Sequence, residues 1–222
     1  MVTRPDVAKA ASILSQHLRN PSPEHLRAAD RVLAYLQATK FLALQYGGNA
    51  SHMTFGTPSL QVYSDAAFAD NLDRKSSDGY LFELNGGPID WRASKQSTTT
   101  TSSTEAELLA LSRTAKELIA WQRLFNLMNL EVDDQELIYS DNRQTIRLLT
   151  ADEPLLTTKL RHVDIHQHWL REKVQMHEID VDWTSTTTMK ADGFTKLLTR
   201  QPFERFVQQL NLVDIQDAIE DA

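Results

Sequence analysis

The chain has 222 residues, 41% of them hydrophobic, with only seven glycines and seven prolines, which excludes a disordered tail and allows one large domain or a domain with part of a second. It has no cysteine, which excludes disulfides, thiol catalysis and cysteine-containing zinc sites. The formal net charge of -7 argues against a general nucleic-acid binder, but basic residues outnumber acidic ones in residues 1–46, so the total decides little about partners.

Residues 1–46 predict two helices and a short strand. Ser22 followed by Pro23 is typical of a helix start, because a serine side chain caps the free N–H groups and proline suits the first turn. A piece this small would not bury its own apolar faces, so we expect it to pack on something else. The polar, glycine-containing stretch at 47–59 is the best linker candidate.

From residue 60 the pattern predicts strands that then alternate with helices. The expected elements are strands at 60–65, 79–84 and 89–92, a helix at 104–128, a strand at 137–139, a short helix at 145–149, a helix at 159–176, a strand at 179–183, a helix at 189–198 and a last helix near 203–210. Three meandering strands followed by such an alternation imply a mixed sheet with helices on its faces. Four tryptophans are expected in the core: Trp91, Trp121, Trp169 and Trp183.

Two aspartates follow the same local pattern, an apolar strand that ends in Tyr-Ser-Asp. If the strands before Asp65 and Asp141 are parallel neighbours, their carboxylates lie side by side at the edge of the sheet where α/β proteins build sites. Like charges so close need a cation, and oxygen ligands favour Mg²⁺ or Mn²⁺. For each aspartate, a role in a turn or a helix cap is the open alternative.

Two further acidic residues lie at expected helix starts. Thr104 with Glu107 and Ser102 with Glu105 both have capping-box spacing, so either glutamate could serve the helix end. Glu107 borders the apolar stripe and is expected to point toward the strand ends, whereas Glu105 is expected to face water. Asp192 lies in a first helical turn, where the helix dipole alone favours an acidic residue.

These motifs match a known family in order and spacing. They are Tyr63-Ser64-Asp65-Ala66-Ala67-Phe68-Ala69-Asp70, Ser77-Asp78-Gly79-Tyr80, Ser102-Ser103-Thr104-Glu105-Ala106-Glu107, Tyr139-Ser140-Asp141-Asn142 and Lys190-Ala191-Asp192. Together they resemble the ribonuclease H domain of copia-type (Pseudoviridae) retrotransposon Pol polyproteins. The resemblance covers almost the whole chain.

The resemblance implies an α/β, ribonuclease H-like fold with a five-stranded mixed sheet flanked by helices and preceded by a small helical segment. It implies that Asp65, Glu107, Asp141 and Asp192 form a catalytic site for two Mg²⁺ ions, or Mn²⁺, which hydrolyses the RNA strand of RNA/DNA hybrids during reverse transcription. The rival interpretation is a catalytically silent, retroelement-derived module that binds nucleic acid or a partner without cutting.

The resemblance also divides the chain. Residues 1–46 resemble the end of the reverse-transcriptase region, a thumb/connection remnant, and 60–200 the ribonuclease H domain, while the residues themselves predict the linker at 47–59 and a C-terminal helix with an acidic tail at 201–222. An RNA/DNA hybrid and the polymerase region are the expected partners, and no DNA synthesis is expected because the polymerase motif Tyr-x-Asp-Asp is absent. Without an apolar run long enough for a membrane helix or a secretory signal, an intracellular, cytoplasmic place is expected, with a virus-like particle or the nucleus as further places.

Seven residues are predicted to contact nucleic acid. Polar side chains suit 2′-hydroxyls and basic ones suit phosphates, which gives Ser76, Arg92, Lys95, Asn142, Lys159, Arg161 and His162. For the basic segment around residue 161, a solvated helix face is the open alternative. The loop at 184–188 lacks the histidine that assists product release in many ribonucleases H.

Overall fold

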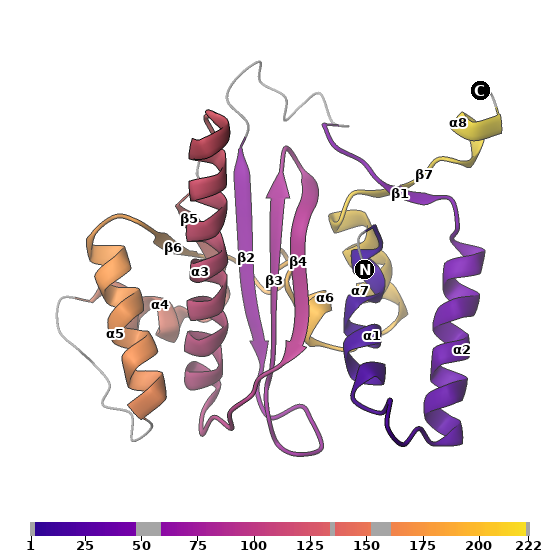
Figure 1. The fold of residues 1–222 in the computed structure, drawn as a ribbon, viewed down its shortest axis with the longest axis horizontal. Coiled ribbons are helices and arrows are strands. Elements are labelled where there is room, and N and C mark those ends of the chain that lie inside the picture. Colours follow the sequence, from indigo (N-terminus) through magenta and orange to yellow (C-terminus); the bar gives the residue numbers. More distant parts are fainter. Residues whose placement is uncertain (1–2, 48–58, 134–135, 152–160, 221–222) are drawn as a thin grey trace.

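The centre of the protein is a five-stranded mixed sheet (Figure 1). The computed structural model describes residues 3–47, 59–133, 136–151 and 161–220, with only the backbone of 161–162, and every statement below concerns these. In spatial order the strands are β4 (Gly87–Lys95), β3 (Ser77–Leu84), β2 (Leu60–Ala67), β5 (Leu137–Ser140) and β6 (Asp180–Trp183). β2, β3 and β4 are antiparallel, whereas β5 is parallel to β2 and β6. The expected fold class, a ribonuclease H-like mixed sheet flanked by helices, is confirmed.

The antiparallel half of the sheet follows from its turn chemistry. Asn85 and Gly86 form the two-residue loop between β3 and β4, and both have positive φ values, 52° and 76°. Such a loop matches the right-handed twist of the strands, and asparagine with glycine tolerates it. The predicted hairpin therefore forms, although Gly87 and Pro88 already belong to β4.

One face of the sheet is covered by α3 (Ser103–Met128), with α5 (Arg161–Gln175) and α4 (Arg143–Thr150) beyond it (Figure 1). The apolar stripe that predicted this long helix lies in the main core. Leu111 and Leu118 of α3 are buried there against Phe82 and Ile138 of the strands. The burial of these apolar side chains is the main source of the domain's stability.

The opposite face is covered by three short helices from both ends of the chain: α1 (Ala8–Ser15), α6 (Asp192–Thr195) and α7 (Arg200–Gln209) (Figure 1). A second apolar cluster lies here, in which Tyr63 and Leu81 of the sheet meet Phe194 and Phe206. The two aromatic rings of α6 and α7 pack edge to face, 5.2 Å apart.

The N-terminal segment is joined to the C-terminal one by a small second sheet. A 3₁₀ turn (Pro5–Val7) leads into α1, and α2 (Pro23–Ala38) begins where Ser22 caps it, as predicted. β1 (Leu42–Leu44) pairs antiparallel with β7 (Leu212–Asp214), a strand that the sequence did not predict, and α8 (Gln216–Glu220) follows. The division into 1–46, 60–200 and 201–222 stays a prediction, and most of the linker at 47–59 lies outside the described residues.

The helix predicted at 189–198 is wrong in length, because α6 spans only four residues and α7 follows separately. Lys196 adopts an extended backbone, with φ of -118° and ψ of 146°, and ends the helix. Gly193 packs directly under the Phe206 ring, where a Cβ would lie 2.4 Å from a ring carbon. Tertiary packing of α7 on α6 therefore decides this local structure.

The four tryptophans divide three to one. Trp121 and Trp169 pack against the main core and Trp91 against the second cluster, as expected. Trp183 corrects the prediction: it ends the edge strand β6 and is 41% exposed. Within the described part of the chain, no helix is both long and apolar enough to cross a membrane.

Candidate active site

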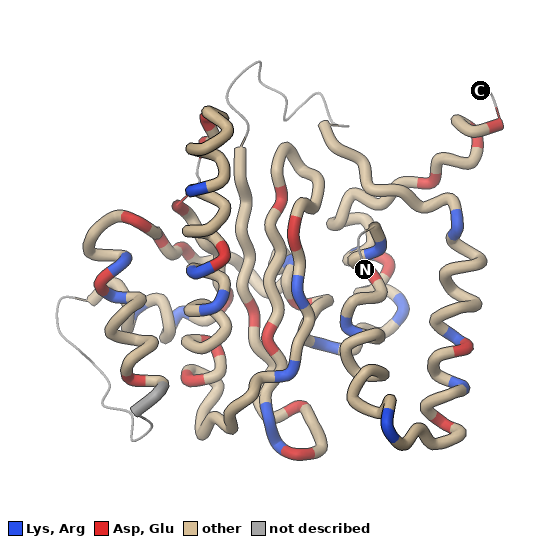
Figure 2. Tube along the Cα trace, in the orientation of Figure 1, with Lys and Arg blue, Asp and Glu red and all other residues tan. Residues whose placement is uncertain are grey.

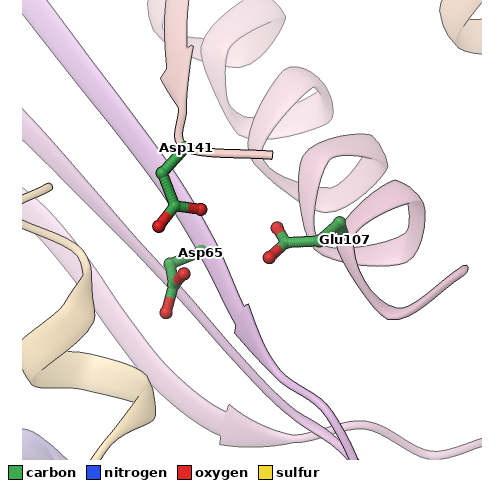
Figure 3. Close-up of side chains that lie close together, drawn as sticks. All are labelled: Asp65, Glu107 and Asp141. Carbon is green, nitrogen blue, oxygen red and sulfur yellow. The ribbon is translucent and has the colours of Figure 1, made fainter. Parts of the chain in front are cut away.

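Three of the four predicted carboxylates meet beside the C-terminal ends of the inner strands β2 and β5 (Figure 3). One oxygen each from Asp65, Glu107 and Asp141 lies within 4.8 Å of the others. Asp65 belongs to β2 and Asp141 directly follows β5, and these strands are parallel neighbours that pair Tyr63 with Tyr139. The strand order thus brings the two aspartates side by side, as the sequence predicted, while α3 supplies the glutamate from the adjoining face.

Glu107 is free to face the site because other residues cap α3. The Ser102 side chain accepts the backbone N–H of Glu105 (3.2 Å), and the Glu105 carboxylate in turn accepts the backbone N–H of Thr101 (2.6 Å). Glu107 is only 6% exposed and lies against the sheet. The capping role that competed for this residue therefore belongs to Ser102 and Glu105.

Asp141 is likewise not a helix cap. The cap of α4 is Asn142, whose side-chain oxygen accepts the backbone N–H of Thr145 (3.0 Å). One carboxylate oxygen of Asp141 accepts a hydrogen bond from the Thr186 hydroxyl (3.0 Å), and its backbone carbonyl accepts one from the Trp183 indole (3.2 Å). The side chain is thus oriented by the 184–188 loop, which holds it toward the other carboxylates.

The fourth carboxylate, Asp192, is brought in by α6, which can approach β2 and β3 only because residue 79 is glycine. Gly79 lies opposite Asp65, and a Cβ there would be 2.7 Å from the Phe194 Cβ and 3.0 Å from Thr195 Cγ2. The Thr195 hydroxyl donates to an Asp65 carboxylate oxygen. A close backbone approach, not a turn, is therefore the role of this glycine.

Lys196 holds Asp192 and Asp65 together. Its ammonium is 2.5 Å from Asp192 Oδ1 and 3.5 Å from Asp65 Oδ2. The sequence analysis did not single out this lysine or Thr195. Their spacing was an available signal, since residues three and four positions after Asp192 share its side of a helical turn.

The electrostatics of the cluster favour a bound cation. Burial raises the pKa of Asp65 to about 6, against the opposing effect of the Lys196 ammonium and with an addition from the neighbouring aspartates. Burial also raises the pKa of Glu107 well above its ordinary value, and the Asp65 and Asp141 charges add to that shift. The pKa of Asp192 is raised mainly by burial, although Lys196 opposes it. One lysine thus leaves the four carboxylates short of positive charge.

The raised pKa of Lys196 reflects the same excess of negative charge around it. Burial by itself lowers the pKa of this ammonium, but the Asp65 and Asp192 charges outweigh burial and the net shift is upward. Three carboxylates, two of them buried, whose oxygens lie within 4.8 Å of one another offer the oxygen ligands that Mg²⁺ and Mn²⁺ prefer. The residues present therefore fit a divalent ion of this kind.

The structure describes the side chains of four of the seven predicted nucleic-acid contacts: Ser76, Arg92, Lys95 and Asn142. Ser76 is fully buried, with its hydroxyl bonded to the Ala69 N–H (3.1 Å) and to Thr100 (3.0 Å), so it shapes the β2–β3 loop and does not offer an exposed contact. Arg92 is exposed and donates to Ser94 (3.1 Å), and Lys95 is 3.0 Å from Asp73. Both stay predictions.

Three other predicted contacts cannot be placed and one is partly used. Lys159 lies outside the described residues, as do the side chains of Arg161 and His162. The side-chain oxygen of Asn142 is already engaged, because it accepts a hydrogen bond as the cap of α4. Lys and Arg are interspersed with Asp and Glu along α2, α3, α5, α7 and β4 (Figure 2), so any contact with a polyanion depends on individual basic residues.

Comparisons with known proteins connect the chain to transposons; no protein-family profile matches it. It is 37% identical over 204 residues to the retrovirus-related Pol polyprotein from transposon TNT 1-94 of Nicotiana tabacum, covering 91% of this chain and 14% of that protein. It is 33% identical over 218 residues to the one from transposon RE1 of Arabidopsis thaliana, covering 96% and 14%. The chain thus spans about a seventh of the polyproteins that it matches.

A shorter relative and some solved structures are also similar. The secreted RxLR effector protein 161 of Plasmopara viticola is 45% identical over 120 residues, covering 54% of this chain and 80% of that protein. Among solved structures, LC11-RNase H1 in complex with an RNA/DNA hybrid has a TM-score of 0.45 at 15% identity, covering 61% of this chain and 93% of that one.

Proposed function

The chain belongs to the Pol polyproteins of copia-type retrotransposons, and on that premise we propose that it is their ribonuclease H, a metal-dependent nuclease that hydrolyses the RNA strand of RNA/DNA hybrids. The observation that carries the proposal is the convergence of Asp65, Glu107 and Asp141 at the strand ends. Asp192 completes the set through its link to Lys196 and Asp65. Placing three carboxylates so close together costs free energy unless a cation offsets their charge, so packing alone does not explain the cluster.

The four carboxylates would hold the metal. Two Mg²⁺ ions bound there would activate a water for attack on the phosphorus and stabilise the leaving oxygen. The protein's own groups orient the ligands: the Thr195 hydroxyl fixes one oxygen of Asp65, and the Thr186 hydroxyl fixes one of Asp141. These two donors therefore fix the orientation of the Asp65 and Asp141 carboxylates before a metal binds.

The resemblance to these polyproteins supports the RNA/DNA hybrid as the proposed substrate. Distinguishing RNA from DNA requires contact with 2′-hydroxyls, and the half-buried Asn142, next to Asp141, is the predicted residue nearest the carboxylates in the chain. Its oxygen accepts from the α4 backbone, and no hydrogen bond of its amide NH₂ is recorded among the described residues. An amide NH₂ offers two donors to a hydroxyl oxygen.

The polymerase region of the same polyprotein is the proposed partner. α2 has no buried residue, and Leu26 and Leu33, which are 56% and 64% exposed, lie two turns apart on it. An apolar helix face left in water is typical of a surface that another unit covers. Leu26→Glu combined with Leu33→Glu should abolish binding to a separately expressed polymerase region and leave hydrolysis unchanged; unchanged binding would contradict this partner.

One assay tests the nuclease against the silent-module alternative. The purified chain and its Asp65→Asn variant are incubated with a hybrid labelled on the RNA strand, with and without Mg²⁺, beside duplex RNA and duplex DNA as controls. We expect Mg²⁺-dependent cutting of the hybrid's RNA strand only, leaving 5′-phosphate and 3′-hydroxyl ends, and none by the variant. Binding without cutting by the unmutated chain would favour the silent module, and equal cutting by both proteins would contradict the site.

A further inference from the structure

An arginine and a tryptophan from different elements form a stacked pair beside the carboxylates. Arg143 is the first residue of α4 and Trp183 is the last residue of β6. The guanidinium carbon of Arg143 lies 4.1 Å from the centre of the Trp183 ring. The same indole donates its N–H to the backbone carbonyl of Asp141 (3.2 Å), so the pair is tied to a residue of the candidate metal site.

Neither side chain of this pair serves the core. Trp183 is 41% exposed and Arg143 is exposed, and within the described residues Arg143 forms no ion pair with a carboxylate. Because the Trp183 ring is partly exposed to water, it contributes less stability than a fully buried indole would. The ring instead covers one face of the guanidinium, which limits the orientations that the arginine side chain can adopt.

Stacking leaves the useful edge of the arginine open. The N–H donors of a guanidinium lie in its plane, so a ring over its face does not block them. That fork matches two oxygens of a phosphate, and its charge is fixed at any physiological pH. A polyanion that approaches four carboxylates also needs a local positive charge to offset repulsion.

We propose that Arg143 binds a phosphate of the cleaved strand next to the scissile one, and that Trp183 is the positioning residue that holds the guanidinium for it. The cleaved strand is the one that must reach the carboxylates, and the pair lies next to them, since Arg143 is two residues from Asp141 and the Trp183 indole contacts the Asp141 carbonyl. The inference rests on the proposed nuclease function and adds a substrate-binding residue to it that the sequence analysis did not identify.

The chain offers a matched control on the same helix. Arg147 is exposed on α4, one turn after Arg143, and no aromatic contact of it is recorded among the described residues. Arg143→Met, Arg143→Lys, Trp183→Leu, Trp183→Phe and Arg147→Met are compared for hybrid affinity at several salt concentrations, and for KM and kcat with Mg²⁺.

For Arg143→Met we expect KM to rise about tenfold, the range of a lost charged hydrogen bond, with kcat little changed. The slope of log affinity against log salt should fall by about 1, the loss of one phosphate contact. Arg143→Lys should recover the salt slope but not the full affinity, because an ammonium cannot bind two oxygens in a fixed plane. Trp183→Leu should raise KM less than Arg143→Met does, Trp183→Phe should restore it, and Arg147→Met should change neither quantity.

Two results would overturn the inference. One is that Arg143→Met and Arg147→Met raise KM and lower hybrid affinity equally, which indicates a general charge effect. The other is that Arg143→Met changes neither KM nor affinity. Because affinity and cutting are measured separately, the two proposals fail in different ways. If the chain cuts the hybrid and Arg143→Met changes neither KM nor affinity, only this inference is contradicted. If the chain binds the hybrid without cutting it, and Arg143→Met still weakens that binding, the proposed nuclease function is contradicted but the phosphate contact is supported.

Discussion

The two faces of the sheet are assembled in different ways. On the α3 face, the sheet packs against one long helix that is the next element after β4, and α3 delivers Glu107 within its first turns. The opposite face is formed by α1, α6 and α7, which come from both ends of the chain, and delivers Asp192 from a helix of four residues. Asp65, in the central strand β2, contacts groups from both sides.

This difference shows where the site is robust and where it depends on distant packing. Asp65, Glu107 and Asp141 are placed by the pairing of β2 with β5 and by the start of α3, which packs on the sheet over the main core. Asp192, Thr195 and Lys196 are placed only while α6 stays pressed against Gly79. We therefore expect changes on the α3 face to act on the site only through the ligand itself, and changes on the α6 face to act through geometry.

The largest effect should come from the ligand on the α3 face. Glu107→Gln removes a metal-binding charge and should lower kcat roughly a thousandfold, because metal-assisted charge stabilisation contributes several kcal/mol to such a reaction. Glu105→Gln is the matched control two residues away, in the cap, and should keep activity within about twofold. Initial rates on labelled hybrid measure both. If the order were reversed, the helix phase assigned here would be wrong.

On the α6 face, the sharpest test changes no ligand. Gly79→Ala places a methyl group 2.7 Å from the Phe194 Cβ, so α6 must shift away from Asp65. A displacement of about 1 Å is expected to cost roughly a hundredfold in rate. Gly86→Asn, in the hairpin turn, keeps a tolerated positive φ where no neighbouring atom lies within 4 Å of the added Cβ, and should leave the rate unchanged. Equal rates for both variants would show that α6 does not position the site.

The metal should stabilise the fold in a pH-dependent way. The folded pKa of Asp65 is about 6, above its ordinary 3.8, so between these values the metal-free folded state binds more protons than the unfolded state. Its contribution to the free energy of unfolding therefore falls as pH rises through that window.

Under the proposed function, Mg²⁺ would bind the ionised carboxylates and offset this loss. At a hundredfold excess over Kd it should add about 2.7 kcal/mol, or roughly 5–10 °C in Tm, at neutral pH. The increment should shrink at a pH below about 6 and be absent in Asp65→Asn. Thermal melts with and without Mg²⁺ at both pH values measure it, and an increment that grows on acidification contradicts the assigned ligands.

The smallest expected effect concerns the N-terminal segment. Lys9 of α1 is buried, 2.7 Å from the Ser77 hydroxyl and 3.2 Å from Asp70 Oδ2. Lys9→Met should lower the free energy of unfolding by about 2 kcal/mol, since it leaves these groups without their donor. Arg27→Met removes an exposed pair with Glu24 and should cost under about 0.5 kcal/mol. Urea titrations compare them; equal costs would mean that residues 1–46 are not integrated into the domain.

The sequence by itself determined the elements whose signals lie within a few residues. The long helix, the hairpin, the Ser22 cap and the Tyr-Ser-Asp strand ends were predictable because periodicity, turn chemistry and capping act over a few residues. It also identified Asp65, Glu107 and Asp141, although it could not separate metal binding from capping. That choice needed coordinates, which show Ser102, Glu105 and Asn142 at the caps.

Only the tertiary structure decided the α6 face and the surroundings of the site. The early end of α6, the β1–β7 pairing, the position of Lys196 between two aspartates and the exposure of Trp183 all depend on contacts between residues far apart in the chain. Local propensity is weak beside packing of this kind, as Gly193 under Phe206 illustrates. A sequence pattern therefore predicts the residues that can bind a metal, and the packed fold determines which of them meet.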